Sequence, residues 1–111
     1  KMPDARLKLT KLVELWKNDK SISKEYHKWV IDQPCFATGS FQVAKPHHHR
    51  MAGWCGMGQK PADIFELPIT YEIHTAIHSL GVREFERIYS IDLFDELEKQ
   101  HNYFLEGRDD L

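Results

Sequence analysis

The chain has 111 residues, of which 41% are hydrophobic and 29% are charged, and its formal net charge is -2 at pH 7. This composition predicts one folded domain over residues 1–111 and argues against a strongly basic nucleic-acid binder. No apolar run approaches membrane-spanning length and no secretory leader is visible, so we expect no membrane partner. Cys35 and Cys55 form no Cys-x-x-Cys pair and suggest no disulfide scaffold, which favours a reducing, cytoplasmic location.

The N-terminal part, residues 1–33, is predicted to be helical. Apolar residues recur at helical spacing in Asp4–Asn18. A second, shorter apolar stripe begins at Ile22, and Pro34 ends it. We expect both helices to serve as scaffold.

The next stretch has no helical period. Apolar residues on either side of Gly39 predict two short strands around a turn within Cys35–Pro46. Three glycines predict a loop over Met51–Lys60, and Ile64–Ile69 is expected to be a short extended segment.

The rest of the chain is predicted to be helical. A helix capped by Thr70 should run to Leu80, where a glycine stops it. Two more helices are expected over Val82–Ile88 and Asp92–Leu105. The expected fold class is therefore α+β, with a β-β-loop-α unit between helical flanks.

Charge is distributed unevenly along the chain. Residues 33–62 contain no Asp or Glu, but they contain Lys45, Arg50, Lys60 and three histidines. Residues 91–111 carry seven acids against two bases. The middle of the chain is therefore locally electropositive, which permits a polyanionic ligand there.

Histidines form two groups in this middle region. His74 and His78 are four apart on a predicted helix, a spacing that suits two imidazole ligands of one metal ion, although a half-exposed surface pair has the same spacing. His47, His48 and His49 follow a proline at the end of a predicted strand. Because adjacent side chains of an extended segment point to opposite faces, one can bind a metal while the next addresses a substrate. A fortuitous polar loop is the alternative.

The order and spacing of these motifs resemble the HNH, or ββα-metal (His-Me finger), nucleases. They are most similar to small HNH-type domains encoded in bacteriophage recombination regions. The matching stretches are PHHHR, GMGQKPADIFELPI and HTAIH, and the resemblance covers about Trp29–Gly81. It implies a ββα-metal finger over residues 34–81, between the N-terminal helices and a helical C-terminal part over residues 82–111.

The resemblance also implies roles for individual residues. His47, His74 and His78 take the three metal-ligand positions. His48 takes the position of the general base. Asp63 falls near the central Asn/Asp position, which helps to orient the base in this family.

The match leaves the register of the histidine run and the presence of a second metal to be decided. A register one residue later, with His48 as ligand and His49 as base, stays open. Many relatives carry a Cys-x-x-Cys before the His pair and a cysteine after Leu-Pro-hydrophobic, which suggests a structural zinc site. Here Thr38 and Thr70 occupy two of those positions, so Cys35 lacks its partners and a second, structural zinc is not expected.

The implied reaction is metal-dependent hydrolysis of a DNA phosphodiester bond. A neutral His48 would take a proton from water, and one divalent ion (Mg, Mn, Ni or Zn) on the histidine ligands would stabilise the transition-state charge. Lys45, Arg50 and Lys60 are candidate substrate-binding residues that contact phosphates. The expected partners are DNA and, for a phage protein, other phage or host recombination proteins in the host cytoplasm.

Two other classes of function fit parts of the sequence. A non-catalytic DNA-binding module of a phage recombination protein would use the metal only to hold the finger together, and it would need the ligands but not His48. A protein-interaction module would instead dock its acidic C-terminal segment, residues 92–110, on a partner.

Overall fold

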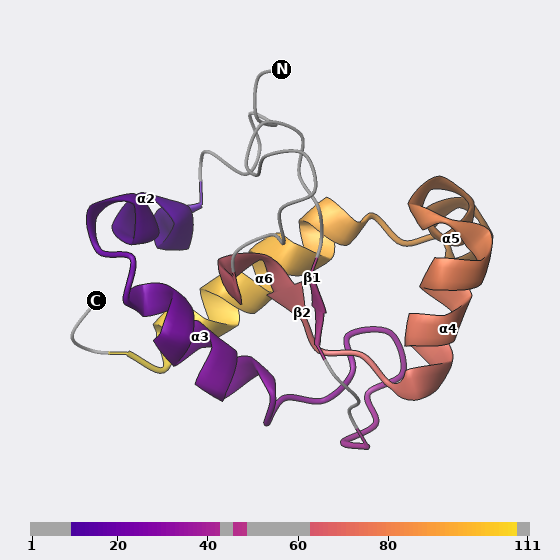
Figure 1. Cartoon of the computed structure of the whole chain (residues 1–111), viewed down its shortest axis with the longest axis horizontal. Coiled ribbons are helices and arrows are strands. Elements are labelled where there is room, and N and C mark those ends of the chain that lie inside the picture. The colour runs from indigo at the N-terminus through magenta and orange to yellow at the C-terminus, as the bar shows by residue number, and fades with distance from the viewer. Residues whose placement is uncertain (1–9, 43–45, 49–62, 109–111) are drawn as a thin grey trace.

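The computed structural model describes residues 10–42, 46–48 and 63–108 (Figure 1). The described residues form an α+β structure that is mostly helical, with a single pair of two-residue strands. In chain order the elements are α2 (Lys11–Asn18), α3 (Ile22–Val30), β1 (His47–His48), the 3-10 helix η1 (Asp63–Phe65), β2 (Glu66–Leu67), α4 (Tyr71–Leu80), α5 (Val82–Tyr89) and α6 (Leu93–Glu106). None of the described helices is long and apolar enough to cross a membrane.

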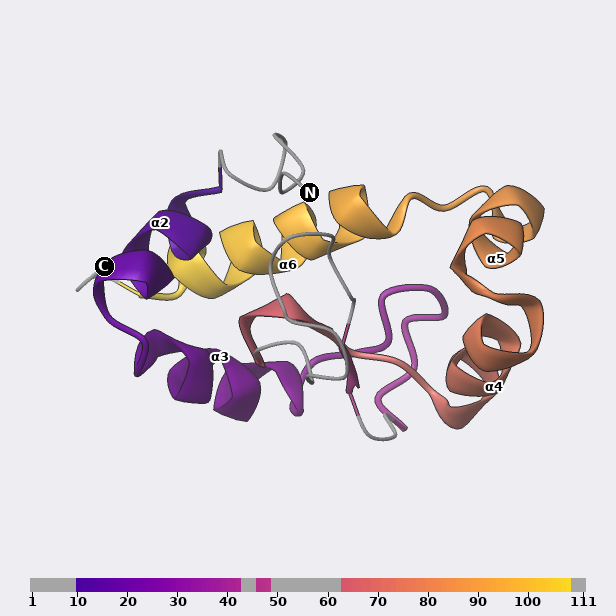
Figure 2. The ribbon, with the colours of Figure 1, turned by 45° about the horizontal axis from the view of Figure 1, so that its top comes forward.

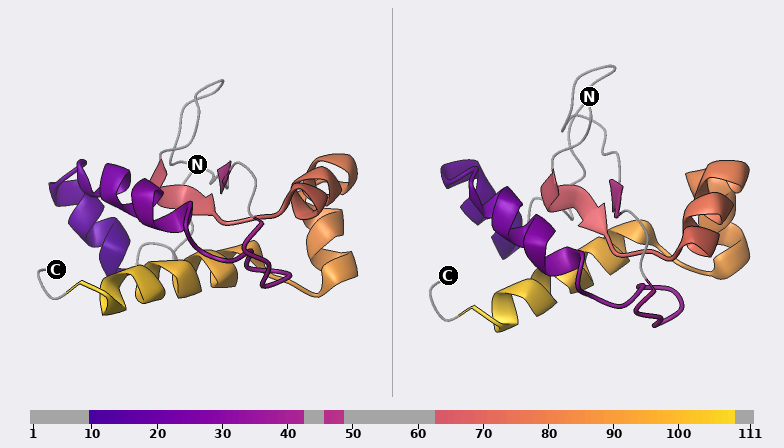
Figure 3. Two further views of the ribbon diagram at one scale, coloured as in Figure 1. Left: turned by 90° about the horizontal axis from the view of Figure 1, so that it is seen from below. Right: turned by 60° about the horizontal axis from the view of Figure 1, so that its bottom comes forward.

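The elements are arranged along the longest helix, α6. Helices α2 and α3 lie toward its C-terminal end, and α4 and α5 form a helical hairpin beyond its N-terminal end (Figure 2). Strand β2 contacts both α3 and α6 and pairs with β1, as two further views show (Figure 3). The short strands therefore lie between the two helical groups.

The core is built around the segment that connects η1 to α4. Every side chain at residues 64–67 is fully buried, and so is Ile69. Helices α2, α3, α4, α5 and α6 each contribute apolar side chains to the same cluster, namely Leu12, Val13, Ile22, Tyr26, Val30, Ile73, Ile77, Phe85, Leu93, Leu97 and Phe104. Burial of this surface is the main stabilising contribution to the fold.

The helices expected from the sequence are confirmed where they are described. Thr70 caps α4 by accepting a hydrogen bond from the Ile73 N–H at 3.4 Å, and α4 ends at Gly81, whose φ is 83°. Helix α2 begins after a similar cap, in which Thr10 accepts from the Val13 N–H. The residues before Thr10 in the expected first helix lie outside the described ranges.

The expected strand pair within Cys35–Pro46 is wrong for its described part, residues 35–42. A turn forms instead, in which the Gly39 N–H donates to the Cys35 carbonyl and the Cys35 N–H donates to the Ser40 carbonyl, both at 2.8 Å. Gly39 has a φ of 75°, a left-handed conformation that suits glycine and closes the turn. Phe41 is 75% exposed, so the apolar alternation that predicted a strand does not reflect a buried face.

The expected extended segment Ile64–Ile69 is confirmed in part. Its first residues belong to the 3-10 helix η1, and only Glu66–Leu67 form a strand. Pro68 limits the strand because proline has no N–H to donate to a ladder.

His101 of α6 links three elements in the core. Its Nε2 lies 2.7 Å from the Ile64 carbonyl oxygen and its Nδ1 lies 3.4 Å from Thr10 Oγ1. Because a carbonyl oxygen only accepts, Nε2 carries the proton and donates it. Burial lowers the pKa of His101 to about 4, against the opposing effect of the hydrogen bond to Ile64.

This lowered pKa predicts a loss of stability in mild acid. The unfolded chain binds a proton at His101 below about pH 6.5, whereas the folded chain resists protonation down to about pH 4. The contribution is therefore complete above about pH 6.5 and declines as the pH falls, by about 3 kcal/mol in total. His101→Gln should flatten this decline, measured as the free energy of urea unfolding at a series of pH values.

The control is Ile64→Val, which removes one buried methyl group beside the same histidine. It should lower the free energy of unfolding by about 1 kcal/mol at every pH and keep the wild-type decline. If the free energy of unfolding of His101→Gln fell with decreasing pH as steeply as that of wild type, the lowered pKa of His101 would not be the cause of the decline.

Candidate functional site

Strand pairing and a short connection place His47 near helix α4. Strands β1 and β2 are antiparallel, with His47 opposite Leu67 and His48 opposite Glu66. The chain continues from β2 through residues 68–70 into α4, which carries His74 and His78. A short, buried connection therefore fixes β1 relative to α4.

Three imidazoles meet where β1 approaches α4. The ring centroids of His74 and His78 are 4.4 Å apart, and those of His47 and His78 are 6.3 Å apart. Two imidazoles that share one tetrahedral ion have centroids roughly 5 Å apart, given metal–nitrogen distances of about 2 Å. These centroid distances are compatible with ligands of one ion, provided that side-chain rotations direct a nitrogen of each ring toward a common point.

The surroundings of His74 fit a metal ligand. Its Nδ1 is buried and has no hydrogen-bond partner among the described residues. A buried imidazole nitrogen normally has a partner, and coordination to a metal would supply one. His78, one turn later on α4, is exposed, which leaves the group accessible from solvent.

The remaining predicted site residues are placed only in part. His48 lies in β1, but its side chain is outside the description. The candidate phosphate contacts Lys45, Arg50 and Lys60, and the alternative base His49, lie outside the described residues.

Asp63 does not join the three histidines but belongs to a second cluster. One donor atom each of His27, Asp63 and Glu66 lies within 4.8 Å of the other two. His27 Nδ1 is 2.7 Å from Glu66 Oε1. The Glu66 side chain is 1% exposed, whereas that of His27 is 41% exposed.

Sequence reasoning missed this second cluster because His27 is far from the other two residues in the chain. The available signal was Glu66 itself, a charged residue within the otherwise apolar run IFELPI. A carboxylate is rarely buried without a specific partner, so such an interruption indicates a polar contact in the core.

Cys35 lies at the meeting point of two other segments. Burial alone would raise the pKa of its thiol, but hydrogen bonds from the Thr38 side chain and from the backbone of Ala37, Thr38 and Thr70 lower it overall. Positions 35, 38 and 70 are those at which many of the HNH-type domains that the sequence resembles carry cysteines. They gather around one sulfur atom here.

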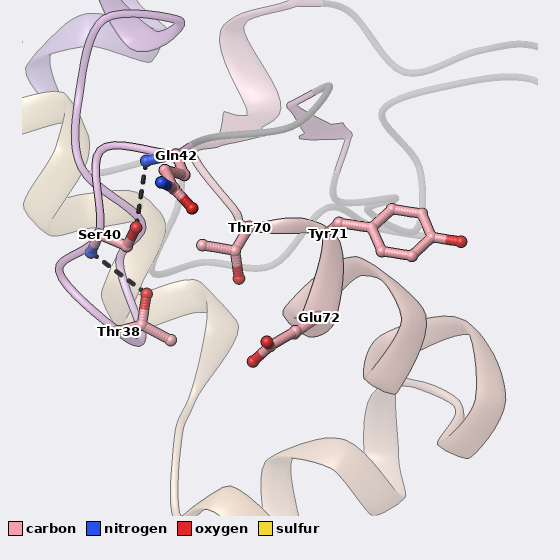
Figure 4. A pocket seen from close by; sticks show the side chains of 6 residues that line it. All are labelled: Thr38, Ser40, Gln42, Thr70, Tyr71 and Glu72. Atoms are coloured by element: carbon pink, nitrogen blue, oxygen red, sulfur yellow. Dashed lines mark hydrogen bonds between the residues drawn. The ribbon is translucent and has the colours of Figure 1, made fainter.

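A polar pocket of about 240 Å³ lies beside the start of α4 (Figure 4). Its wall includes a loop in which the Ser40 N–H donates to Thr38 Oγ1 at 3.2 Å and the Gln42 N–H donates to Ser40 Oγ at 3.1 Å. Glu72 is the charged residue among its lining side chains, which are Thr38, Ser40, Gln42, Thr70, Tyr71 and Glu72.

Comparison with known proteins places the chain in a family. Over 67 residues it is 34% identical to a protein of Escherichia coli (strain K12) described as "Uncharacterized protein YdfU". That match covers 60% of this chain but spans only 19% of the relative's length. No solved structure matches the chain. Residues 10–102 match the family described as "Protein of unknown function (DUF968)", and because this match covers most of the chain, the chain belongs to that family.

Proposed function

We propose that this chain is a metal-dependent HNH-type DNA endonuclease that acts in phage DNA recombination or processing. The observation that carries the proposal is the meeting of His47 with His74 and His78. These residues come from two separate elements, and together they provide the imidazole ligands of one divalent ion. A chance surface pair on α4 would not account for the third ring.

The order of the surrounding elements supports a ββα-metal finger. An antiparallel strand pair is followed directly by a capped helix, and the histidines lie on the first strand and on the helix. The gathering of positions 35, 38 and 70 around one thiol agrees with the same resemblance, in which many HNH-type domains hold cysteines at these positions, although two of them are threonines here.

The donor set fits one divalent transition ion. Imidazole nitrogens suit Zn, Ni or Mn better than Mg, which prefers oxygen ligands and water. With three protein ligands the ion keeps open positions, as a catalytic site requires. The bound ion would stabilise negative charge on the scissile phosphate and on the leaving oxygen.

His48 is the proposed general base. It follows the ligand His47 directly, so the two alternate along the strand and can serve different tasks. A neutral imidazole with a pKa near 6.5 can accept a proton from the attacking water at neutral pH. Lys45, Arg50 and Lys60 would hold the DNA backbone through its phosphates.

The direct test is nicking of supercoiled plasmid after chelation and dialysis, with Mg, Mn, Ni or Zn added back. His48→Ala should lower the nicking rate by about 100-fold or more and keep metal affinity, because a general base contributes that much to the rate. His74→Ala/His78→Ala should lose both nicking and metal binding. Equilibrium dialysis against the same ions measures the binding.

His49→Ala is the matched control for the base. If His48→Ala kept normal nicking activity and His49→Ala lost it, the alternative register would hold, with His49 as the general base. Metal binding without cleavage of plasmid, single-stranded or branched DNA would overturn the nuclease proposal in favour of a DNA-binding module.

Positions 35, 38 and 70, which gather around the Cys35 thiol, give a second prediction. Thr38→Cys/Thr70→Cys should create a zinc site with Cys35, because three thiolates near one point supply three of the four ligands of a tetrahedral zinc ion and water can supply the fourth. Added Zn should then raise the midpoint of thermal unfolding by roughly 5 °C or more, whereas it should not do so for Thr38→Ser/Thr70→Ser.

Cys35→Ser in the double-cysteine background should remove most of this gain. An equal gain with and without Cys35 would mean that the three positions do not share one ion.

A further inference from the structure

We propose that His27, Asp63 and Glu66 form a second divalent-cation site. It is separate from the three-histidine centre, which consists of His47, His74 and His78. One donor atom from each residue lies within 4.8 Å of the others. The donors come from α3, η1 and β2, three elements that contact one another in the fold. An ion placed among them would be held by one imidazole nitrogen and two carboxylates.

The segments that carry these donors are fixed independently of any ion. The Tyr26 hydroxyl donates to the Glu66 carbonyl oxygen at 2.7 Å, and the Ile64 N–H donates to Ser23 Oγ at 3.1 Å. Both hydrogen bonds tie the η1–β2 segment to α3, next to His27. Such pre-organisation lowers the cost of assembling a ligand set when the ion binds.

The placement of the donors also suits an ion that enters from solvent. The Glu66 carboxylate is almost fully buried at the inner side of the cluster, whereas His27 is 41% exposed at the outer side. The His27–Glu66 contact of 2.7 Å is a hydrogen bond that a metal ion held by both side chains would replace.

The chemistry of the donors indicates which ions fit. Two carboxylates and one imidazole suit Mn²⁺, Co²⁺ or Zn²⁺, and they suit Mg²⁺ and Ca²⁺ less because of the nitrogen. Two carboxylate charges also balance a divalent cation.

This site lies on the other side of β2 from the three histidines. Adjacent strand residues face opposite ways, so Glu66 and Leu67 point to different faces of the strand pair. Leu67 is opposite His47, and Glu66 is opposite His48 in the register. Helix α3 packs against β2, whereas the α4–α5 hairpin lies beyond the end of β2, where the chain continues into α4 (Figure 3).

Counting bound ions tests the proposal. We would dialyse the full chain to equilibrium against Co²⁺ and measure the bound ions per chain together with the visible absorption of bound Co²⁺. Wild type should bind two ions. His27→Gln and Asp63→Asn should each remove one ion, and circular dichroism would verify the fold. Glu25→Gln, which removes an exposed carboxylate from α3, is the matched control and should keep both ions.

The same measurement separates this proposal from the proposed function. His74→Ala/His78→Ala should retain one ion, bound at the second site, and the further change Asp63→Asn should remove it. If wild type binds one ion that His27→Gln and Asp63→Asn both keep, the His27–Glu66 pair is structural and the second site is overturned, while the three-histidine centre stands. If the single ion survives in His74→Ala/His78→Ala but is lost in Asp63→Asn, the second site stands and the proposed catalytic centre fails.

Discussion

Burial of residues 64–69 between α3 and α6 is the constraint on which the placement of both clusters depends. Among the described residues this segment has one strand partner, β1, and several of its other backbone polar groups pair with core residues. The Ile64 carbonyl accepts from His101, the Glu66 carbonyl from Tyr26, and the Pro68 carbonyl from the Phe36 N–H. A buried polar group left without a partner costs about 1–3 kcal/mol, so these contacts hold the segment in one position. Strand β1 and the start of α4 are positioned as a result.

The helices could be predicted from the sequence because their signals are local. Thr70 and Gly81 mark the ends of α4 by side-chain capping and by a positive φ, and both effects involve residues only a few positions apart. The strands could not be placed in the same way. The pairing of β1 with β2 joins residues 47 and 67, and the apolar alternation near Gly39 looked like a better strand than either.

The same distinction applies to the candidate sites. His74 and His78 were recognisable from their spacing on one helix, and His47 from its place in a histidine run. The association of His27 with Glu66 had no counterpart in spacing, because 39 positions separate the two residues. Only the tertiary contact between α3 and β2 brings them together. A buried charge within an apolar run was the sole local sign of this contact.

The register of the β1–β2 pair bears on which histidine of β1 is the proposed metal ligand and which is the proposed general base. Leu67 is fully buried, and its partner His47 has its ring 6.3 Å from that of His78, on the side of α4. A slip of one residue would exchange the faces, so that His48 would replace His47 opposite Leu67. That slip is opposed by the burial of Leu67 and by the Tyr26 hydrogen bond that fixes Glu66. The observed pairing therefore keeps His47 opposite Leu67, on the side of α4, as the proposed ligand role requires.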